Sequence, residues 1–208
     1  MKTNRFISVE GSEGAGKSTS LHFIESWFKS RAIEPLMTRE PGGTPLAEQI
    51  RDLLLESRNE KVATNTELLL MYAARVQHCE QLIKPALDDG RWVISDRFND
   101  ASFAYQGSAR GVDIARLESL DNWCLDGFGP DYTLFLDLPV AIGMERAGKR
   151  SAPDRFEQEA MDFFERVRQG YLARAKQFPE RFYIIDSSLS IPEVEGQLDK
   201  VLEQIVNG

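Results

Sequence analysis

Cysteine, histidine and long apolar runs are what this chain of 208 residues has least of. It carries two cysteines and two histidines, too few for a disulfide scaffold or a cysteine-rich zinc site. Its longest apolar run, Leu68 to Ala74, is far shorter than the roughly 18 residues of a membrane span. The N-terminus lacks the long apolar core of a signal peptide, so we expect a cytoplasmic protein with no membrane contact.

Basic residues are also fewer than acidic ones: 25 against 33, which gives a net charge of −8. A binder of nucleic acid needs a basic face, so we expect no nucleic-acid partner. Hydrophobic residues make up 42% and charged residues 28%, which is ordinary for a globular protein. The length fits one domain over residues 1–208, at about 150 residues per domain with room for a lid.

Strand and helix patterns alternate along the chain. Short apolar runs predict strands at 6–9, 35–38, 92–95, 132–138 and 182–185. Helical periodicity predicts helices at 18–30, 46–55, 67–87, 114–125, 140–146, 158–176 and 191–206. Such alternation predicts an α/β fold, with a five-stranded parallel sheet flanked by helices in three layers. The polar stretch 147–155 is too short for a domain, and we expect it to be a lid.

A phosphate-binding motif follows the first predicted strand. Residues 11–18 match G-x-x-x-x-G-K-[ST] and open the first predicted helix. The glycines let backbone N–H groups point at phosphate oxygens, and the helix N-terminus adds its positive dipole end. Lys17 supplies a charge to the β- and γ-phosphates, and Ser18 supplies a hydroxyl to Mg²⁺. The sequence therefore predicts a P-loop NTPase-type fold that binds a nucleoside triphosphate.

Two absent motifs and one basic segment indicate which reaction the bound nucleotide serves. The chain has no N-K-x-D segment of a regulatory GTPase and no L-S-G-G-Q of a transport ATPase. The stretch from Arg146 to Arg155, with Lys149 and Arg150 between them, is basic. It predicts either a solvated loop or a lid that brings positive charge to a transferring phosphoryl group and excludes water. A small P-loop chain with such a lid suggests phosphoryl transfer to a small acceptor.

Charges follow two predicted strands. Asp96 and Arg97 stand at the end of the third predicted strand, and Arg39 follows the second. Ligands of open parallel sheets bind outside the carboxyl ends of the strands. There Asp96 can hold Mg²⁺ or its waters, and Arg97 can clamp a phosphate. The alternatives are a surface ion pair for Asp96–Arg97 and a polar turn at Arg39.

An arginine inside an apolar helix is a second candidate. Arg75 shares a helix face with Met71 and Tyr72, since neighbours three and four apart align. An arginine beside an apolar or aromatic surface suits a flat, polar-edged base, although it can also reach water along its stem. Ser102, Tyr105 and Gln106 offer a hydroxyl, a ring and an amide, but a plain helix end explains them equally well.

These motifs together resemble the bacterial thymidylate kinases. The resemblance rests on F-I-S-V-E-G-S-E-G-A-G-K-S, T-R-E-P-G-G-T, Y-A-A-R, S-D-R-F, A-Y-Q-G and D-R-F-E, which run in the family's order over nearly the whole chain. It implies transfer of the γ-phosphoryl group of ATP to dTMP, giving dTDP on the route to dTTP. It also implies Mg²⁺ and a homodimer. The alternatives are another small-molecule nucleotide or nucleoside kinase and a non-catalytic nucleotide-binding module.

The resemblance also implies roles for single residues. Those implied to bind ATP are Gly11, Ser12, Glu13, Gly14, Ala15, Gly16, Lys17, Ser18, Thr19 and Arg146. Those implied to bind dTMP are Glu13, Arg39, Met71 or Tyr72, Arg75, Arg97, Ser102, Tyr105 and Gln106. Arg97 would clamp the phosphate, Arg75 would hydrogen-bond the thymine edge and Tyr105 would pack on the deoxyribose. Catalysis would rest on Lys17, Asp96, Arg97 and Arg150, and the metal on Ser18 and Asp96.

Overall fold

The computed structural model describes residues 5–148 and 159–207, in which strands and helices alternate as the sequence predicts. The strands are β1 (Phe6–Glu10), β2 (Leu36–Arg39), β3 (Val93–Asp96), β4 (Tyr132–Asp137) and β5 (Phe182–Asp186). The helices are α1 (Lys17–Ser30), α2 (Pro45–Leu55), α3 (Thr64–His78), α4 (Lys84–Asp88), α5 (Asn99–Ser102), α6 (Ile114–Leu125), α7 (Val140–Ala147), α8 (Met161–Gln177) and α9 (Ile191–Asn207). Two π-helical turns, η1 (Cys79–Ile83) and η2 (Phe103–Ala109), complete the set.

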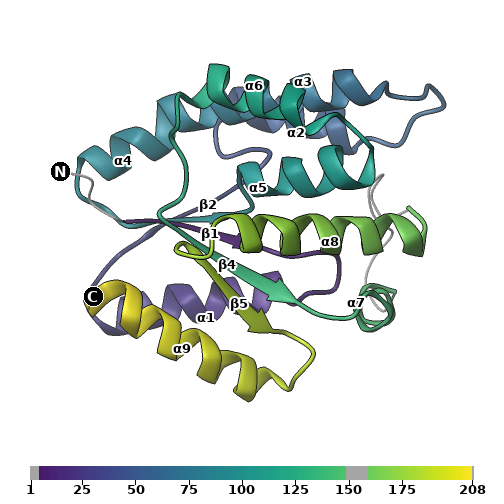
Figure 1. Cartoon of the computed structure of the whole chain (residues 1–208). Coiled ribbons are helices and arrows are strands. Elements are labelled where there is room, and N and C mark those ends of the chain that lie inside the picture. The colour runs from purple at the N-terminus through teal and green to yellow at the C-terminus, as the bar shows by residue number, and fades with distance from the viewer. Residues whose placement is uncertain (1–4, 149–158, 208) are drawn as a thin grey trace.

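The five strands form one parallel sheet in the order β2-β3-β1-β4-β5. Helices α1 and α9 cover one face, and α3, α5 and α6 lie over the other (Figure 1). Alternation along β1 sends Ile7 and Val9 into the core with α1 and α9. Ser8 and Glu10 therefore point to the opposite face, where both are fully buried. The predicted α/β class and parallel five-stranded sheet are confirmed.

Two helical segments differ from the prediction. The single helix predicted at 67–87 is interrupted by η1. Pro85 lies just after this turn and has no N–H to continue the α-helical bonding pattern, which favours the irregular turn before it. The segment α5–η2 follows β3 closely, whereas the sequence suggested only a helix end near Ser102. Of the predicted lid, residues 149–155 lie outside the described residues.

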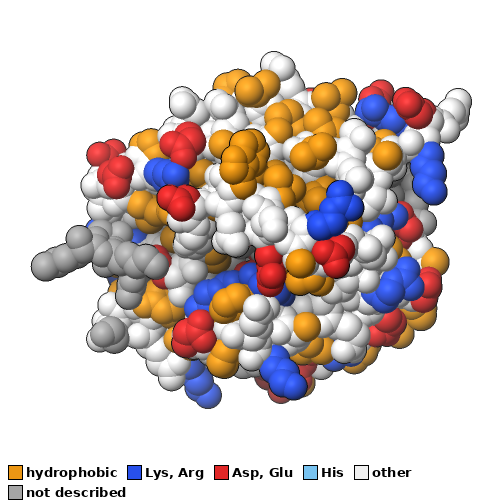
Figure 2. All heavy atoms as spheres, turned by 45° about the horizontal axis from the view of Figure 1, so that its top comes forward, with side chains coloured by type: hydrophobic (Ala, Val, Ile, Leu, Met, Phe, Trp, Pro, Cys, Tyr) orange, Lys and Arg blue, Asp and Glu red, His pale blue; other side chains and the backbone are white. Residues whose placement is uncertain are grey.

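Apolar side chains are exposed on the outer helices. Trp123 of α6 is 83% exposed, and Leu69 of α3 and Ile114 of α6 are also open to solvent. Figure 2 shows hydrophobic side chains gathered on the surface made by the helices at the top of Figure 1. Exposed apolar patches of this kind are typical of protein interfaces. None of the helices within residues 5–148 and 159–207 is long and apolar enough to cross a membrane.

Candidate active site

The P-loop connects the centre of the sheet to α1 and depends on glycine at Gly14. Gly14 has a φ of 71°, and a Cβ there would collide with the carbonyl oxygen of Gly143 in α7. Only glycine fits both the left-handed backbone and the close approach. The Lys17 ammonium donates to the carbonyl oxygens of Gly11, at 3.3 Å, and Ser12, at 3.5 Å. The loop thus curls around its own lysine at the carboxyl end of β1.

Lys17 shares its surroundings with a second cation. Burial and the nearby Arg97 lower the pKa of Lys17, while Glu13 and Asp96 act in the opposite direction. Two positive groups so close together, partly shielded from water, favour the binding of anions. The pair therefore makes a natural receptor for the phosphates of a nucleotide.

Arg97 has an unusual backbone conformation. Its φ is 70°, in the left-handed region that costs a residue other than glycine about 1–3 kcal/mol and that persists mainly at functional sites. Its backbone N–H donates to Val9 at 3.0 Å. The guanidinium donates to Glu13 Oε1 at 3.0 Å and to the Tyr171 hydroxyl at 3.2 Å, and lies 4.8 Å from the centre of the Tyr105 ring. These contacts aim the side chain across the carboxyl edge of the sheet.

Arg75 is buried and makes three hydrogen bonds within the protein, so its side chain does not extend to water. Its Nε donates to Glu40 Oε2 at 2.6 Å, Nη1 to Ser102 Oγ at 3.0 Å and Nη2 to the Phe98 carbonyl at 3.1 Å. Burial acts to lower the pKa of Arg75, but Glu40, together with Tyr72 and Asp121, outweighs it and holds the pKa above its usual range. The sequence favours a partner for a buried arginine; the structure identifies it as Glu40.

Of the two residues considered for the thymine face, Met71 lines the pocket and Tyr72 does not. Tyr72 turns away: its hydroxyl donates to Asp121 of α6 at 2.7 Å, and its ring lies 4.7 Å from the Arg75 guanidinium. Helical spacing puts both residues next to Arg75, but only tertiary packing decides which of them meets the cavity. Met71 is therefore the one of the two alternatives that lies at the cavity, and its contact with a base stays a prediction.

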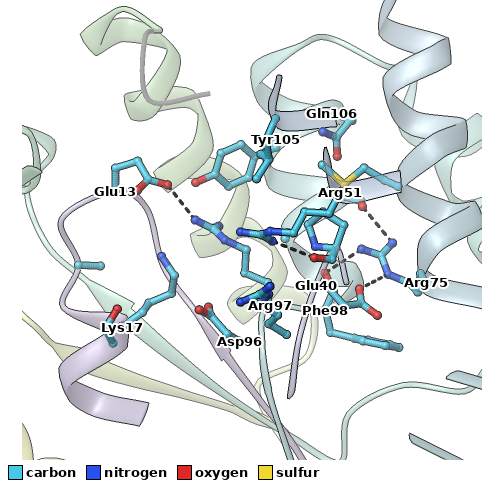
Figure 3. A pocket seen from close by; sticks show the side chains of 18 of the residues that line it. Glu13, Lys17, Glu40, Arg51, Arg75, Asp96, Arg97, Phe98, Tyr105 and Gln106 are labelled. Carbon is cyan, nitrogen blue, oxygen red and sulfur yellow. Dashed lines mark hydrogen bonds and ion pairs between the residues drawn. The ribbon is translucent and has the colours of Figure 1, made fainter. Parts of the chain in front are cut away.

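One cavity brings together most of the predicted site (Figure 3). Lys17 and Glu13 stand on one side, Arg75 on the other, and Arg97 between them. The predicted residues that line it are Glu13, Gly14, Ala15, Gly16, Lys17, Ser18, Arg39, Met71, Arg75, Asp96, Arg97, Ser102, Tyr105 and Gln106. Glu40, Arg51, Leu55 and Phe98 also line it and were not among the predicted ligands. For Glu40 a signal was present, because it follows the strand that ends at Arg39.

A second hollow adjoins the P-loop on the side of α7. It is lined by Gly14, Gly16, Thr19 and Arg146, together with residues of the loop after β5. The Arg146 guanidinium is held there by the carbonyl oxygens of Ser187, at 2.7 Å, and Ser188, at 3.3 Å. Thr19 and Arg146 thus lie together but apart from the main cavity. Arg150 lies outside the described residues.

The acidic side of the cavity fits a divalent cation. Asp96 Oδ1 is buried and has no hydrogen-bond partner within the described ranges, and Ser18 and Asp96 both line the cavity. A buried acceptor without a partner calls for an explanation, and Mg²⁺ or one of its waters supplies one. No group of three His, Cys, Asp or Glu side chains suited to a metal occurs among residues 5–148 and 159–207. The cation would therefore depend largely on phosphate oxygens and water.

A P-loop at the centre of a parallel sheet, facing arginines at the neighbouring strand ends and a partly apolar wall, defines a P-loop nucleotide phosphotransferase. The thymidylate kinase family model matches residues 9–198, and the chain belongs to this family. A thymidylate kinase of Marinomonas sp. (strain MWYL1) is 51% identical, over 97% of this chain and 95% of the relative. One of Nitrosomonas eutropha is 52% identical, over 98% of this chain and 94% of the relative.

Proposed function

We propose that this cavity transfers the γ-phosphoryl group of ATP to dTMP, giving dTDP for the synthesis of dTTP. The observation that carries the proposal is the placement of Arg97. It stands between the P-loop on one side and Arg75 on the other. A phosphate held there would lie between a triphosphate site and a base site, as transfer from one nucleotide to another requires. Membership of the thymidylate kinase family supports the same substrate pair.

The donor side would be formed by the P-loop. Its backbone N–H groups and the N-terminus of α1 would hold the ATP phosphates, and Lys17 would neutralise the β- and γ-oxygens. The hollow that holds Thr19 and Arg146 adjoins the same glycines, so it suits the nucleoside end of ATP. Phosphoryl transfer needs the attacking and leaving oxygens in line. A donor along the P-loop and an acceptor at Arg97 meet that need.

The acceptor phosphate would bind to Arg97. The second pKa of a phosphate monoester is about 6, so the attacking oxygen of dTMP is already anionic near neutral pH. The reaction therefore needs no strong general base. Glu13, which now accepts from Arg97, would lie near the sugar 3′-hydroxyl. Tyr105, whose ring faces the same guanidinium, would pack on the deoxyribose.

Thymine would be read by Arg75. A guanidinium only donates hydrogen bonds, so it suits the carbonyl oxygens of thymine and disfavours the exocyclic amino group of cytosine. Ser102 is bonded to Arg75, and Gln106 is held by Glu67 at 2.9 Å. Both side chains line the cavity, where they would lie beside the base. Met71 would supply the apolar contact with its face.

A metal ion and two further arginines complete the proposed site. Ser18 and Asp96 would hold Mg²⁺, which when bound supplies positive charge to the β- and γ-phosphate oxygens. Arg150 would stabilise the transferring phosphoryl group, and Arg39, which lines the cavity and pairs with Glu48 at 2.9 Å, would add positive charge on the acceptor side.

The assembly we propose is a homodimer that works in the cytoplasm. The exposed apolar side chains of α3 and α6, among them Leu69 and Trp123, offer a face that a second copy would cover. Analytical ultracentrifugation of the purified chain tests this arrangement, since a monomer at micromolar concentration would contradict it.

The activity is tested by an ADP-release assay with Mg-ATP and a panel of acceptors. The panel contains dTMP, dUMP, dCMP, dGMP, AMP, UMP and thymidine. We expect turnover to be fastest with dTMP. If turnover were fastest with another acceptor, the chain would still be a kinase, but the proposed binding of thymine in this cavity would be contradicted. A folded, ATP-binding chain without turnover would instead favour a nucleotide-binding module.

A further inference from the structure

Glu10 is a buried carboxylate that the reaction described above does not use. It ends β1 directly before the P-loop and is fully buried. Its Oε1 accepts from the backbone N–H of Phe98 at 2.7 Å, and its Oε2 accepts from the Tyr171 hydroxyl at 2.8 Å. Glu10 is not among the residues that line the cavity, so a role in the site must act through its neighbours.

Both partners of Glu10 lead to Arg97. Phe98 directly follows Arg97, whose backbone adopts the left-handed conformation. Tyr171, on α8, accepts from the Arg97 guanidinium at 3.2 Å. Because the phenol accepts from Arg97, its one proton is directed to Glu10. A single carboxylate thus holds the main chain beside Arg97 and, through Tyr171, the end of its side chain.

The two sides of the Arg97 guanidinium differ in exposure. Glu13 and Arg97 each keep part of their side-chain surface accessible, 16% and 17%. Tyr171 and Glu10 are fully buried. An incoming phosphate can therefore take the place of Glu13, but it cannot reach the contact with Tyr171. The buried contact is the one that can persist while the acceptor binds.

The position is unfavourable for a carboxylate, which points to a reason for its presence. Burial and the nearby Asp100 raise the pKa of Glu10, while Arg97, Tyr171 and the Phe98 N–H act in the opposite direction. An apolar side chain would avoid that cost. It would, however, leave the Tyr171 proton and the Phe98 N–H without an acceptor.

We propose that Glu10 is a positioning residue, which through Tyr171 and the Phe98 N–H orients Arg97 toward the acceptor phosphate. The proposal rests on the proposed role of Arg97 in binding that phosphate. Its consequence is selective: loss of the link weakens the acceptor side and leaves the ATP side unchanged. A merely structural role would affect both substrates, or only stability.

The test uses the full chain with Glu10→Gln, Tyr171→Phe and the double variant. Glutamine keeps the shape but turns a donating NH₂ group toward a phenol that already accepts from Arg97. Phenylalanine keeps the ring and removes the link. We expect each single variant to raise the KM for dTMP at least about tenfold, the factor for one hydrogen bond to a charged group. The KM for ATP should stay within about twofold.

The double variant tests whether the two residues act as one unit. If both residues belong to one link, the KM for dTMP of the double variant should be no higher than that of the more impaired single variant, because effects within one network are not additive. Tyr183→Phe is the matched control, because this tyrosine of β5 contacts Tyr132 of β4 and none of the residues of the link. Its KM values for dTMP and ATP should equal those of the wild-type chain. Calorimetric titration with dTMP alone gives the same comparison without turnover.

Three results would overturn the proposal. One is an unchanged KM for dTMP in both folded single variants, and another is an equal rise for both substrates. The third is strict additivity in the double variant. If Glu10→Gln fails to fold, Tyr171→Phe carries the test alone. A wild-type chain that does not use dTMP would instead overturn the proposed function, so the two failures are distinguishable.

Discussion

Replacing Arg75 by methionine should destabilise the chain strongly. Its guanidinium makes three hydrogen bonds, to Glu40, Ser102 and the Phe98 carbonyl. The Arg75 and Glu40 side chains are only 3% and 2% exposed. Methionine has a similar length and fills much of the same space. The variant therefore removes the charge and the donors while disturbing the packing little, and it leaves Glu40 beside His78 without its arginine.

The expected magnitude follows from the buried charge. Removing one partner of a buried ion pair costs about 3–5 kcal/mol, which is a large part of the roughly 5–15 kcal/mol that stabilises a typical domain. Arg75→Lys keeps a positive charge near Glu40 but cannot reproduce the planar fork, so its loss should be smaller. In Arg75→Met with Glu40→Gln, no unpaired charge remains. This double variant should recover part of the stability that Arg75→Met alone loses.

Urea unfolding followed by tryptophan fluorescence measures these differences. The free energy of unfolding should fall in the order wild type, Arg75→Lys, Arg75→Met, with the double variant above Arg75→Met. Glu25→Gln serves as the control, because its ion pair with Lys29 is exposed and such pairs contribute about 0–1 kcal/mol. A loss below about 1 kcal/mol for Arg75→Met, or no recovery in the double variant, would refute the reasoning.

Three other expectations concern metal, catalysis and assembly. Asp96→Asn should raise the Mg²⁺ concentration needed for half-maximal turnover at least about tenfold, as one ligand charge is lost; an unchanged Mg²⁺ titration would remove Asp96 from the metal site. Arg150→Ala should lower kcat by about 100-fold or more with the dTMP dissociation constant little changed, and a near-normal kcat in steady-state assays would rule it out of the transfer step. Trp123→Asp should shift sedimentation toward the monomer, whereas an unaltered sedimentation coefficient would show that this face of α6 is not the interface.

The parts of the site that the sequence predicted well are those set by local chemistry and by the rule for parallel sheets. The P-loop is a contiguous motif between a strand and a helix, so its form depends on nearby residues only. Asp96 ends β3, which pairs with β1, and Arg97 follows it; parallel strands bring their carboxyl ends to one edge. The sequence therefore placed Lys17 and Arg97 in one cavity without knowledge of the packing.

The parts it could not predict depend on contacts between distant elements. Arg75 is paired with Glu40, 35 residues away, and no local pattern chooses between that partner and water. Tyr72 lies outside the cavity because α6 offers it Asp121. The link from Glu10 to Tyr171 spans 161 residues. Each of these contacts forms only when the helices pack on the sheet. The periodicity of the sequence therefore predicts which side chains share a helix face, but not which distant residue each of them contacts.

Arg75 and Arg97, two of the arginines that line the cavity, are held in different ways, and the difference matches their proposed tasks. Arg75 donates three of the five N–H groups of a guanidinium to fixed protein acceptors, so its orientation is set before a base arrives and little freedom is lost on binding. Arg97 is fixed on its buried side by Tyr171, while on its accessible side it contacts Glu13. A phosphate can exchange with that carboxylate. In the proposed reaction, specificity for the base would then rest on a rigid contact, and capture of the phosphate on an exchangeable one.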